Sequence, residues 1–128
     1  MKLKAIEILN IYDSLVKISE AEFDLNTACI IANNIKSLSA TKETIDAKRN
    51  DIIAKYAEKN EQGEINSAEN GEAKIVDIGN FNVELNDLLI SVVEVDLKTI
   101  SKSVINDVFK DSKISPKVIL SLMDILED

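Results

Sequence analysis

The chain contains no histidine, no tryptophan and a single cysteine, Cys29, among its 128 residues. Without histidine it lacks the commonest general base and the commonest ligand of transition metals. One cysteine can form neither an internal disulfide nor a thiolate metal site, which fits a reducing cytoplasm. Cys29 stands in an apolar run, so we expect a small buried hydrophobic residue and not a nucleophile. These absences predict a protein that is not an enzyme and holds no cofactor and no metal.

Glycine and proline, the residues that most often interrupt regular structure, are almost absent from the first half of the chain. The first 62 residues contain neither, the only proline is Pro116, and the three glycines are Gly63, Gly71 and Gly79. This distribution divides the chain into a helical arm (1–60), a β-hairpin (61–79) and a compact helix-strand-helix part (80–128). At this length we expect a single domain. We expect no internal repeat.

Positive charge is also scarce. The formal net charge is −8, and residues 63–128 carry six Lys or Arg against thirteen Asp or Glu. Because binding to a nucleic-acid backbone requires many Lys and Arg side chains, we expect no nucleic-acid partner. No segment has the roughly 18 uninterrupted apolar residues of a membrane span. Glu7 and Asp13 interrupt the N-terminal apolar segment, which argues against a signal peptide. We therefore expect a cytoplasmic protein without membrane attachment.

Apolar residues at three- and four-residue steps predict a helix over residues 4–18 and a long helix from Asn26 to about Lys59. Asp24 or Asn26 can cap the long helix. One seam of a heptad repeat follows this helix, with seven-residue spacing between Ile31, Leu38, Ile45 and Ile52. The first helix can cover only about half of such a rod. We therefore expect a homo-oligomer, a dimer or higher, built along it.

The rest of the chain predicts shorter elements. Asn70-Gly71 favours the turn of a small polar hairpin, because both residues tolerate positive φ. A helix at about 81–91, a half-buried strand over 92–100 that can join the hairpin, and a helix from Ser101 to about Phe109 follow. Ser115 and Pro116 begin the last helix as its cap and first residue. The predicted fold is α+β, mostly α, with a long helical spine, a small β-hairpin and C-terminal helices.

The second seam position of the long helix breaks the heptad rule. Seven residues apart, it reads Ala28, Ile35, Lys42, Arg49 and Tyr56, so two charged residues stand at apolar positions. Asp46 lies between them and can pair with either. Their aliphatic stems can pack while the charged ends reach water. Alternatively, they fix the register of an oligomer or bind an anionic ligand or a partner's carboxylate. Lys42, Arg49, Asp46 and Tyr56 are therefore the candidate binding residues.

Four segments of the chain, taken in order and with their spacing, carry a family resemblance. They are Met1-Lys2-Leu3-Lys4 with Leu9-Asn10-Ile11-Tyr12, Tyr56-Ala57-Glu58-Lys59 with Gln62-Gly63, Val93-Glu94-Val95-Asp96-Leu97 with Ile100, and Lys113-Ile114-Ser115-Pro116. They resemble small proteins of unknown function from phages and prophages of Gram-positive bacteria. The stretch from Lys102 to Asp111 is longer here than in that family. The resemblance implies a phage origin and a place in the cytoplasm of the host bacterium, with no catalytic residues to carry over.

Two functions stay open. The first is a phage-encoded, non-enzymatic binding protein that counters host antiviral defence. It would act by binding a host factor or by sequestering a small anionic signal. The second is an accessory protein of phage virion or tail assembly or of morphogenesis. The sequence features favour neither over the other.

Overall fold

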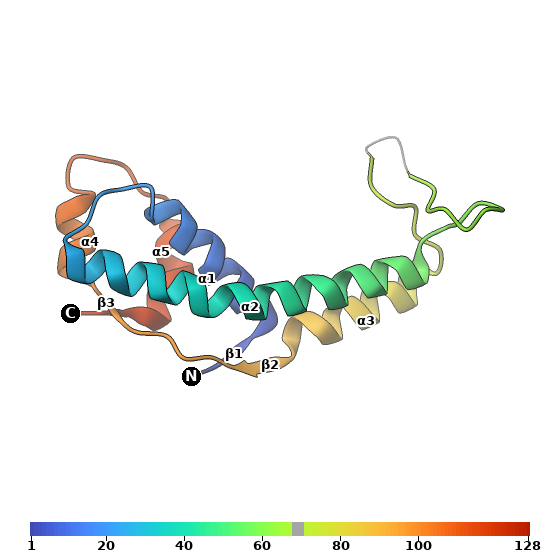
Figure 1. Cartoon of the computed structure of the whole chain (residues 1–128), viewed down its shortest axis with the longest axis horizontal. Coiled ribbons are helices and arrows are strands. Elements are labelled where there is room, and N and C mark those ends of the chain that lie inside the picture. The colour runs from blue at the N-terminus through green and yellow to red at the C-terminus, as the bar shows by residue number, and fades with distance from the viewer. Residues whose placement is uncertain (68–70) are drawn as a thin grey trace. The chain divides into compact units, whose positions relative to one another are not determined.

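The computed structural model describes residues 1–67 and 71–128 of the chain. It is mostly helical with two short strand pairings, so the predicted α+β, mostly α, class is confirmed. The chain forms two compact units, whose elements are labelled in Figure 1. The first unit comprises Met1–Lys42 and Val92–Asp128, and the second unit comprises Glu43–Ser91. Whether these units make one domain stays a prediction.

The first unit begins with helix α1, Ala5–Ile18, close to the predicted range. Its 3.6-residue period turns Ile8, Ile11 and Leu15 into the core, where each is almost fully buried. At its start, the Glu7 carboxylate accepts a hydrogen bond from the backbone N–H of Lys4 at 3.1 Å. This bond satisfies one of the N–H groups that every helix start leaves without an intrahelical acceptor.

Helix α2, Leu25–Tyr56, is the predicted long helix. The carboxylate of Asp24 accepts a hydrogen bond from the backbone N–H of Thr27 at 3.1 Å, so Asp24 is the cap. The hydrogen bonds from Thr27 lower the pKa of Asp24. The helix ends three residues before the predicted Lys59, because the chain enters a β-bridge at Ala57. None of the helices in the described residues has the length and apolar character that a membrane crossing requires.

The C-terminal part of the first unit holds helices α4, Lys102–Val108, and α5, Pro116–Leu122, followed by a 3₁₀ turn, Met123–Ile125. The Ser115 hydroxyl accepts a hydrogen bond from the N–H of Lys117 at 3.2 Å, and Pro116 is the first helical residue, as predicted. Helix α5 packs on α1. Together they bury Leu122 and Ile125 completely.

Two strand pairings complete the first unit. Strand β1, Lys2–Lys4, runs antiparallel to β2, Val92–Glu94, and strand β3, Ile100–Ser101, runs parallel to β4, Leu126–Glu127. The predicted strand over 92–100 was too long, since the strand ends at Glu94 and residues 95–99 form none. The predicted alternation continues past that end, because Val95 is buried while Glu94 and Asp96 are exposed. The predicted partner was wrong: β2 pairs with β1 and not with the hairpin. The N-terminal ammonium group adds an ion pair to Glu94 at 3.0 Å.

In the second unit, three short segments join in a closed ring of backbone hydrogen bonds. Each middle residue donates its N–H to one neighbour and accepts from the other. Glu58 donates to Lys74 at 2.7 Å, Lys74 to Asn66 at 2.9 Å, and Asn66 to Glu58 at 2.8 Å. Antiparallel bridges flank this hydrogen-bond ring at Ala57–Ile75, Lys59–Ile65 and Ser67–Ala73. The hairpin predicted within residues 61–79 pairs residues 64–66 with 73–76, and this pairing is one side of the ring. Asn70, the predicted turn residue of that hairpin, lies outside the described residues.

The ring segments recur every eight residues along the chain, and so do the three glycines. Gly63 and Gly71 have φ values of +81° and +84°, a conformation that glycine adopts without strain. The expectation of no internal repeat was therefore wrong. The repeat escaped notice because little recurs in it besides glycine and an acidic residue two positions earlier.

Helix α3, Ile78–Ile90, follows the ring and begins three residues before the predicted position. Asp77 caps it from a left-handed conformation with φ of 54°, and its carboxylate accepts a hydrogen bond from the side chain of Asn80 at 2.7 Å. No residue of α3 is buried. Among the described residues of the second unit, only Ile45 and Ala57 are buried. This unit therefore has a far thinner core than the first.

Cys29 is exposed, so the expectation of a buried cysteine was wrong. It stands two residues before the buried Ile31, which places it about 200° around the helix from that side chain. An apolar run in a helix contains residues of both faces. Here the run Ala28-Cys29-Ile30-Ile31-Ala32 carries only one buried residue, Ile31.

Candidate functional site

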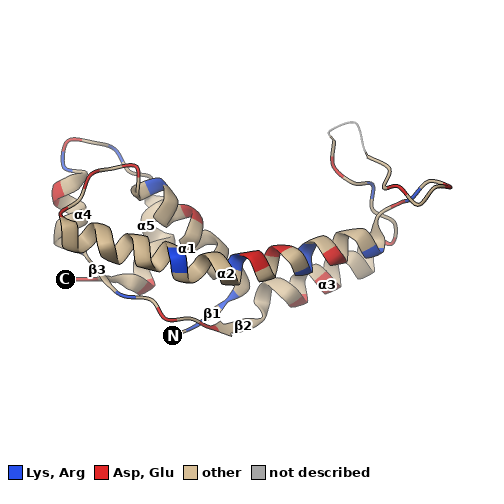
Figure 2. Ribbon diagram, viewed as in Figure 1, with Lys and Arg blue, Asp and Glu red and all other residues tan. Residues whose placement is uncertain are grey.

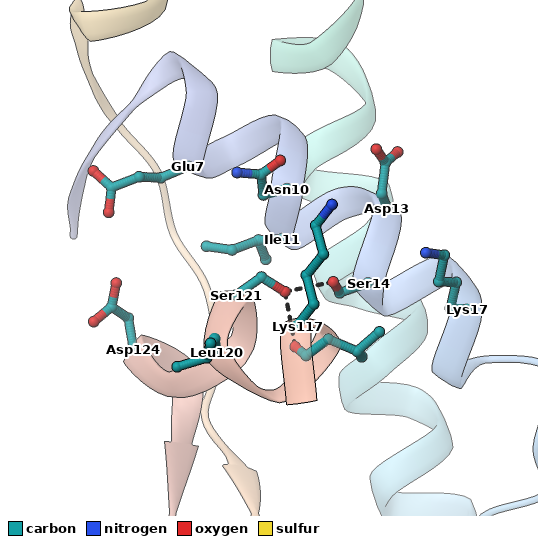
Figure 3. Close-up of a pocket in the computed structure, with 11 residues that line it drawn as sticks. Glu7, Asn10, Ile11, Asp13, Ser14, Lys17, Lys117, Leu120, Ser121 and Asp124 are labelled. Atoms are coloured by element: carbon teal, nitrogen blue, oxygen red, sulfur yellow. Dashed lines mark hydrogen bonds between the residues drawn. The ribbon is translucent and has the colours of Figure 1, made fainter. Parts of the chain in front are cut away.

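A cavity of about 400 Å³ lies between α1 and α5 in the first unit. Figure 3 shows Ser14 of α1 and Ser121 of α5 pointing toward each other there, and their hydroxyl groups form a hydrogen bond. The Ser121 hydroxyl also donates to the carbonyl oxygen of Val118 at 2.8 Å. The proton of Ser121 is thus engaged, so Ser14 is the donor in the bond between the two hydroxyls.

The polar lining of this cavity is mixed in charge. It includes three acidic residues and two basic residues, namely Glu7, Asp13, Asp124, Lys17 and Lys117. A serine nucleophile requires a base that accepts its proton. In the described part of the chain, the hydrogen bonds of Ser14 and Ser121 lead to each other and to a carbonyl group. The residues described here also contain no cluster of three His, Cys, Asp or Glu side chains fit for a metal.

The predicted binding residues fall into both units. Lys42 belongs to the first unit, where its ammonium group lies 5.5 Å from the centre of the Tyr12 ring. At this distance a cation is attracted to the face of an aromatic ring. Asp46, Arg49 and Tyr56 belong to the second unit, and all three are half-buried. A binding role for these four residues stays a prediction.

Tyr56 holds α2 and α3 together inside the second unit. Its ring meets Phe81 of α3 edge to face, with 6.1 Å between the ring centres. Lys55 lies over the same tyrosine ring at 5.3 Å and forms an ion pair with Glu84 of α3 at 2.6 Å. Beside this pair, a groove of about 430 Å³ is lined by Lys48, Asp51, Ile52, Lys55, Glu84, Asp87 and Leu88. The groove also carries more acidic than basic residues.

The ion pair of Lys55 and Glu84 predicts a pH-dependent stability. The hydrogen bond from Lys55 lowers the pKa of Glu84, and the same bond raises the pKa of Lys55. Because Glu84 titrates lower in the folded state, its contribution is present at neutral pH and is lost as pH falls through the lowered pKa. We expect Glu84→Gln to lower the melting temperature slightly at pH 7, and the deficit to disappear in strong acid. The contribution of the ion pair to stability is also lost at strongly alkaline pH, where Lys55 gives up its proton.

Melting curves followed by circular dichroism at several pH values check this expectation. Asp51→Asn serves as the control, since it removes one negative charge from an exposed residue of the same groove. High salt should shrink the effect of Glu84→Gln, because both members of the pair are exposed to solvent. An equal deficit at neutral and strongly acidic pH would contradict the assigned role of the pair.

Comparison with family models, with curated proteins and with solved structures gives no match to this chain. The assignment of a function therefore depends on the chain's own geometry.

Sequence reasoning missed the contacts that join distant parts of the chain. Ser14 and Ser121 are 107 residues apart, and the pairing of Lys55 with Glu84 spans 29 residues. The sequence does carry a signal for the Ser14–Ser121 contact. Ser14 lies three residues after Ile11 and four before Ile18, both buried, so it shares their helix face. A polar residue on an apolar helix face indicates a buried hydrogen bond.

The heptad seam of α2, along which we predicted an oligomer, is already largely buried in the single chain. Ile31, Leu38 and Ile45 are buried, and Ile52 is half-buried. Their burial arises because the chain folds its own helices against α2, so these residues do not offer a free seam to a second copy. An oligomer stays a prediction, and any surface for it has to be sought elsewhere.

Proposed function

We propose that this chain is a non-enzymatic binding protein that works through contacts with another protein. The observation that carries the proposal is the exposure of α3. Seven of its thirteen residues are apolar, yet none is buried. Ile78 is 62% exposed, and the helix period places it on one face with the half-buried Leu85 and Leu89. An apolar helix face that stays open to solvent is typical of protein-binding sites.

The proposal of binding without catalysis is supported by the α1–α5 cavity. Within the described part of the chain, its two hydroxyl groups are hydrogen-bonded to each other and to a carbonyl, and not to a side chain that could act as a base. The α1–α5 cavity and the groove of the second unit both carry more acidic than basic residues, whereas a further pocket of the first unit, lined by Lys17, Glu20 and Lys113 among others, carries one basic residue more than acidic. The exposed apolar side chains of α3 favour a protein partner over a small anionic signal.

The binding surface is the side of the α2–α3 pair away from the groove. Lys48, Ile52 and Lys55 line the groove on α2. The helix period turns Ile53 about 150° away from the centre of that lining and Arg49 about 110°, so Arg49 lies at the flank of the far side. On α3 the same period places Leu85 and Leu89 away from the groove-lining Glu84 and Asp87. An apolar surface with an arginine at its edge is a common composition for a protein-binding hot spot.

We propose a phage origin and a place in the host cytoplasm, which the resemblance noted in the sequence implies. We propose that the partner is a host protein of antiviral defence, which this chain occupies stoichiometrically. A protein of phage assembly would also bind its partner through an apolar surface of this kind. The experiment therefore has to identify the protein that contacts α3.

Site-specific photo-crosslinking in infected bacterial cells tests the proposal. A photoreactive amino acid replaces Ile78 of α3 or, as the control, Leu120 of α5, which is 72% exposed. We expect Ile78 to yield a covalent adduct with a host protein and Leu120 to yield none. We expect Arg49→Ala to reduce the adduct and Lys48→Ala, on the groove side, to leave it unchanged.

Two other outcomes of the cross-linking experiment would contradict the defence role or the binding surface. An adduct between Ile78 and a virion protein would replace the defence role by the assembly role. The absence of any protein adduct at Ile78, or equal adducts at Ile78 and Leu120, would refute binding through this surface.

A further inference from the structure

We propose that α3 pairs in antiparallel orientation with α3 of a second copy of this chain. The contact is made by one stripe of the helix, formed by Gly79, Val83, Asn86 and Ile90, which we name the α3 seam. Steps of four, three and four residues separate its members, the spacing of the core positions of a coiled coil. All four are exposed. The seam is distinct from the side of α3 that carries Leu85 and Leu89, so it goes beyond the function proposed above.

The sizes of the seam residues fit a second copy. Gly79 leaves open space on the helix, since a Cβ atom placed there would meet no other atom within 4 Å. In antiparallel pairing, core positions alternate so that the large Ile90 of one copy lies opposite Gly79 of the other. Val83 then lies opposite Asn86. Twofold symmetry repeats each pair, so the surface is complementary to itself.

The charges of α3 fit the same orientation. The helix carries two acidic residues and no basic residue (Figure 2). Glu84 is engaged by Lys55 of its own chain. Asp87 flanks the seam, and antiparallel pairing places it beside Asn80 of the second copy and not beside another carboxylate. A side-chain amide can donate a hydrogen bond to that carboxylate. No like charges therefore face each other across the seam.

The second unit needs additional burial. Only Ile45 and Ala57 of its described residues are buried. Small units with so little core are held by disulfides, by metals or by oligomerisation. The single cysteine, Cys29, lies in the first unit, and the described residues show no metal cluster. Pairing through the α3 seam supplies the missing apolar contact.

Light scattering coupled to gel filtration tests the dimer with the purified full chain. We expect a mass twice that of the 14.2 kDa chain. Val83→Glu places a charge in the seam and should give the mass of a single chain with unchanged helical circular dichroism. Asn82→Glu, the same charge on an adjacent residue outside the seam, should leave the dimer intact. A single-chain mass for the unaltered protein, or a dimer that survives Val83→Glu, overturns the proposal.

Cysteine cross-linking tests the orientation in a Cys29→Ser background. The double variant Val83→Cys with Asn86→Cys should form a covalent dimer on mild oxidation, because antiparallel pairing places each cysteine opposite the other type. Val83→Cys alone should cross-link poorly. Equal cross-linking by Val83→Cys alone shows parallel pairing and overturns the orientation.

Gly79→Leu tests the fit of Ile90 into the glycine gap. It should raise the dissociation constant of the dimer about tenfold or more, since a larger side chain overpacks the contact. An unchanged dissociation constant contradicts this packing. Because the host-protein test uses Ile78, outside the seam, a failure of the dimer and a failure of the proposed function give separate results.

Discussion

Replacing Asn34 with alanine is expected to lower the free energy of unfolding by about 2–3 kcal/mol, since two partly buried backbone groups of Lys98 lose their hydrogen bonds. Asn34 is 1% exposed on α2. Its side-chain amide donates to the carbonyl of Lys98, and its side-chain oxygen accepts from the N–H of Lys98, both at 2.9 Å. The backbone of Lys98 has no other strand beside it in the described sheets. One side chain thus takes the place of a β-ladder.

Urea denaturation followed by circular dichroism measures this loss. Asn33→Ala is the matched control, because Asn33 is the same residue type one position earlier and is exposed. Its effect should stay within about 0.5 kcal/mol. Asn34→Leu should also destabilise the protein, since it restores volume but leaves the Lys98 groups without partners. If Asn34→Ala and Asn33→Ala proved equally mild, water would be replacing the amide and the attachment would be unimportant.

Replacing Leu122 with alanine should cost about 2–5 kcal/mol, the usual range for emptying a packed core position. Leu122 is fully buried on α5, in the helix that packs on α1. For a chain of this size, each kcal/mol should shift the melting temperature by roughly 3–6 °C. Thermal unfolding of the variant therefore gives a large and easily measured change.

Leu120→Ala provides the control for this second prediction. Leu120 has the same side chain in the same helix but is 72% exposed. Its truncation should change stability by less than about 0.5 kcal/mol. Neither variant removes an atom of the Ser14–Ser121 hydrogen bond. Equal melting temperatures for the two variants would show that α5 does not pack as described.

The helices were predictable because their signals are local. Helix α1 could be read from the three- and four-residue spacing of Ile8, Ile11 and Leu15, and α5 from Ser115 and Pro116. The caps at Asp24 and Ser115 follow from side chains that bond within three residues. Such contacts need no knowledge of the rest of the chain.

The strand partners and the polar contacts could not be predicted, because they join distant segments. Strand β2 pairs with the N-terminal Lys2-Leu3-Lys4, whose three residues are too few to show an alternating pattern. Asn34 and Lys98 are 64 residues apart, and one of the partners is backbone. Among the candidate binding residues, Arg49 is half-buried, as the heptad spacing of α2 predicts for a seam position. The contact of Tyr56 with Phe81 depended on the position of α3.

The hydrogen-bond ring restricts how this part of the chain can change in length. Most surface connections tolerate the gain or loss of single residues. In the ring, each eight-residue unit supplies one donor and one acceptor to its neighbours. Removing one or two residues moves a segment out of register, and removing a whole unit leaves the remaining two with unpaired groups. Related chains should therefore keep the glycine spacing of eight even where every other residue of the unit differs.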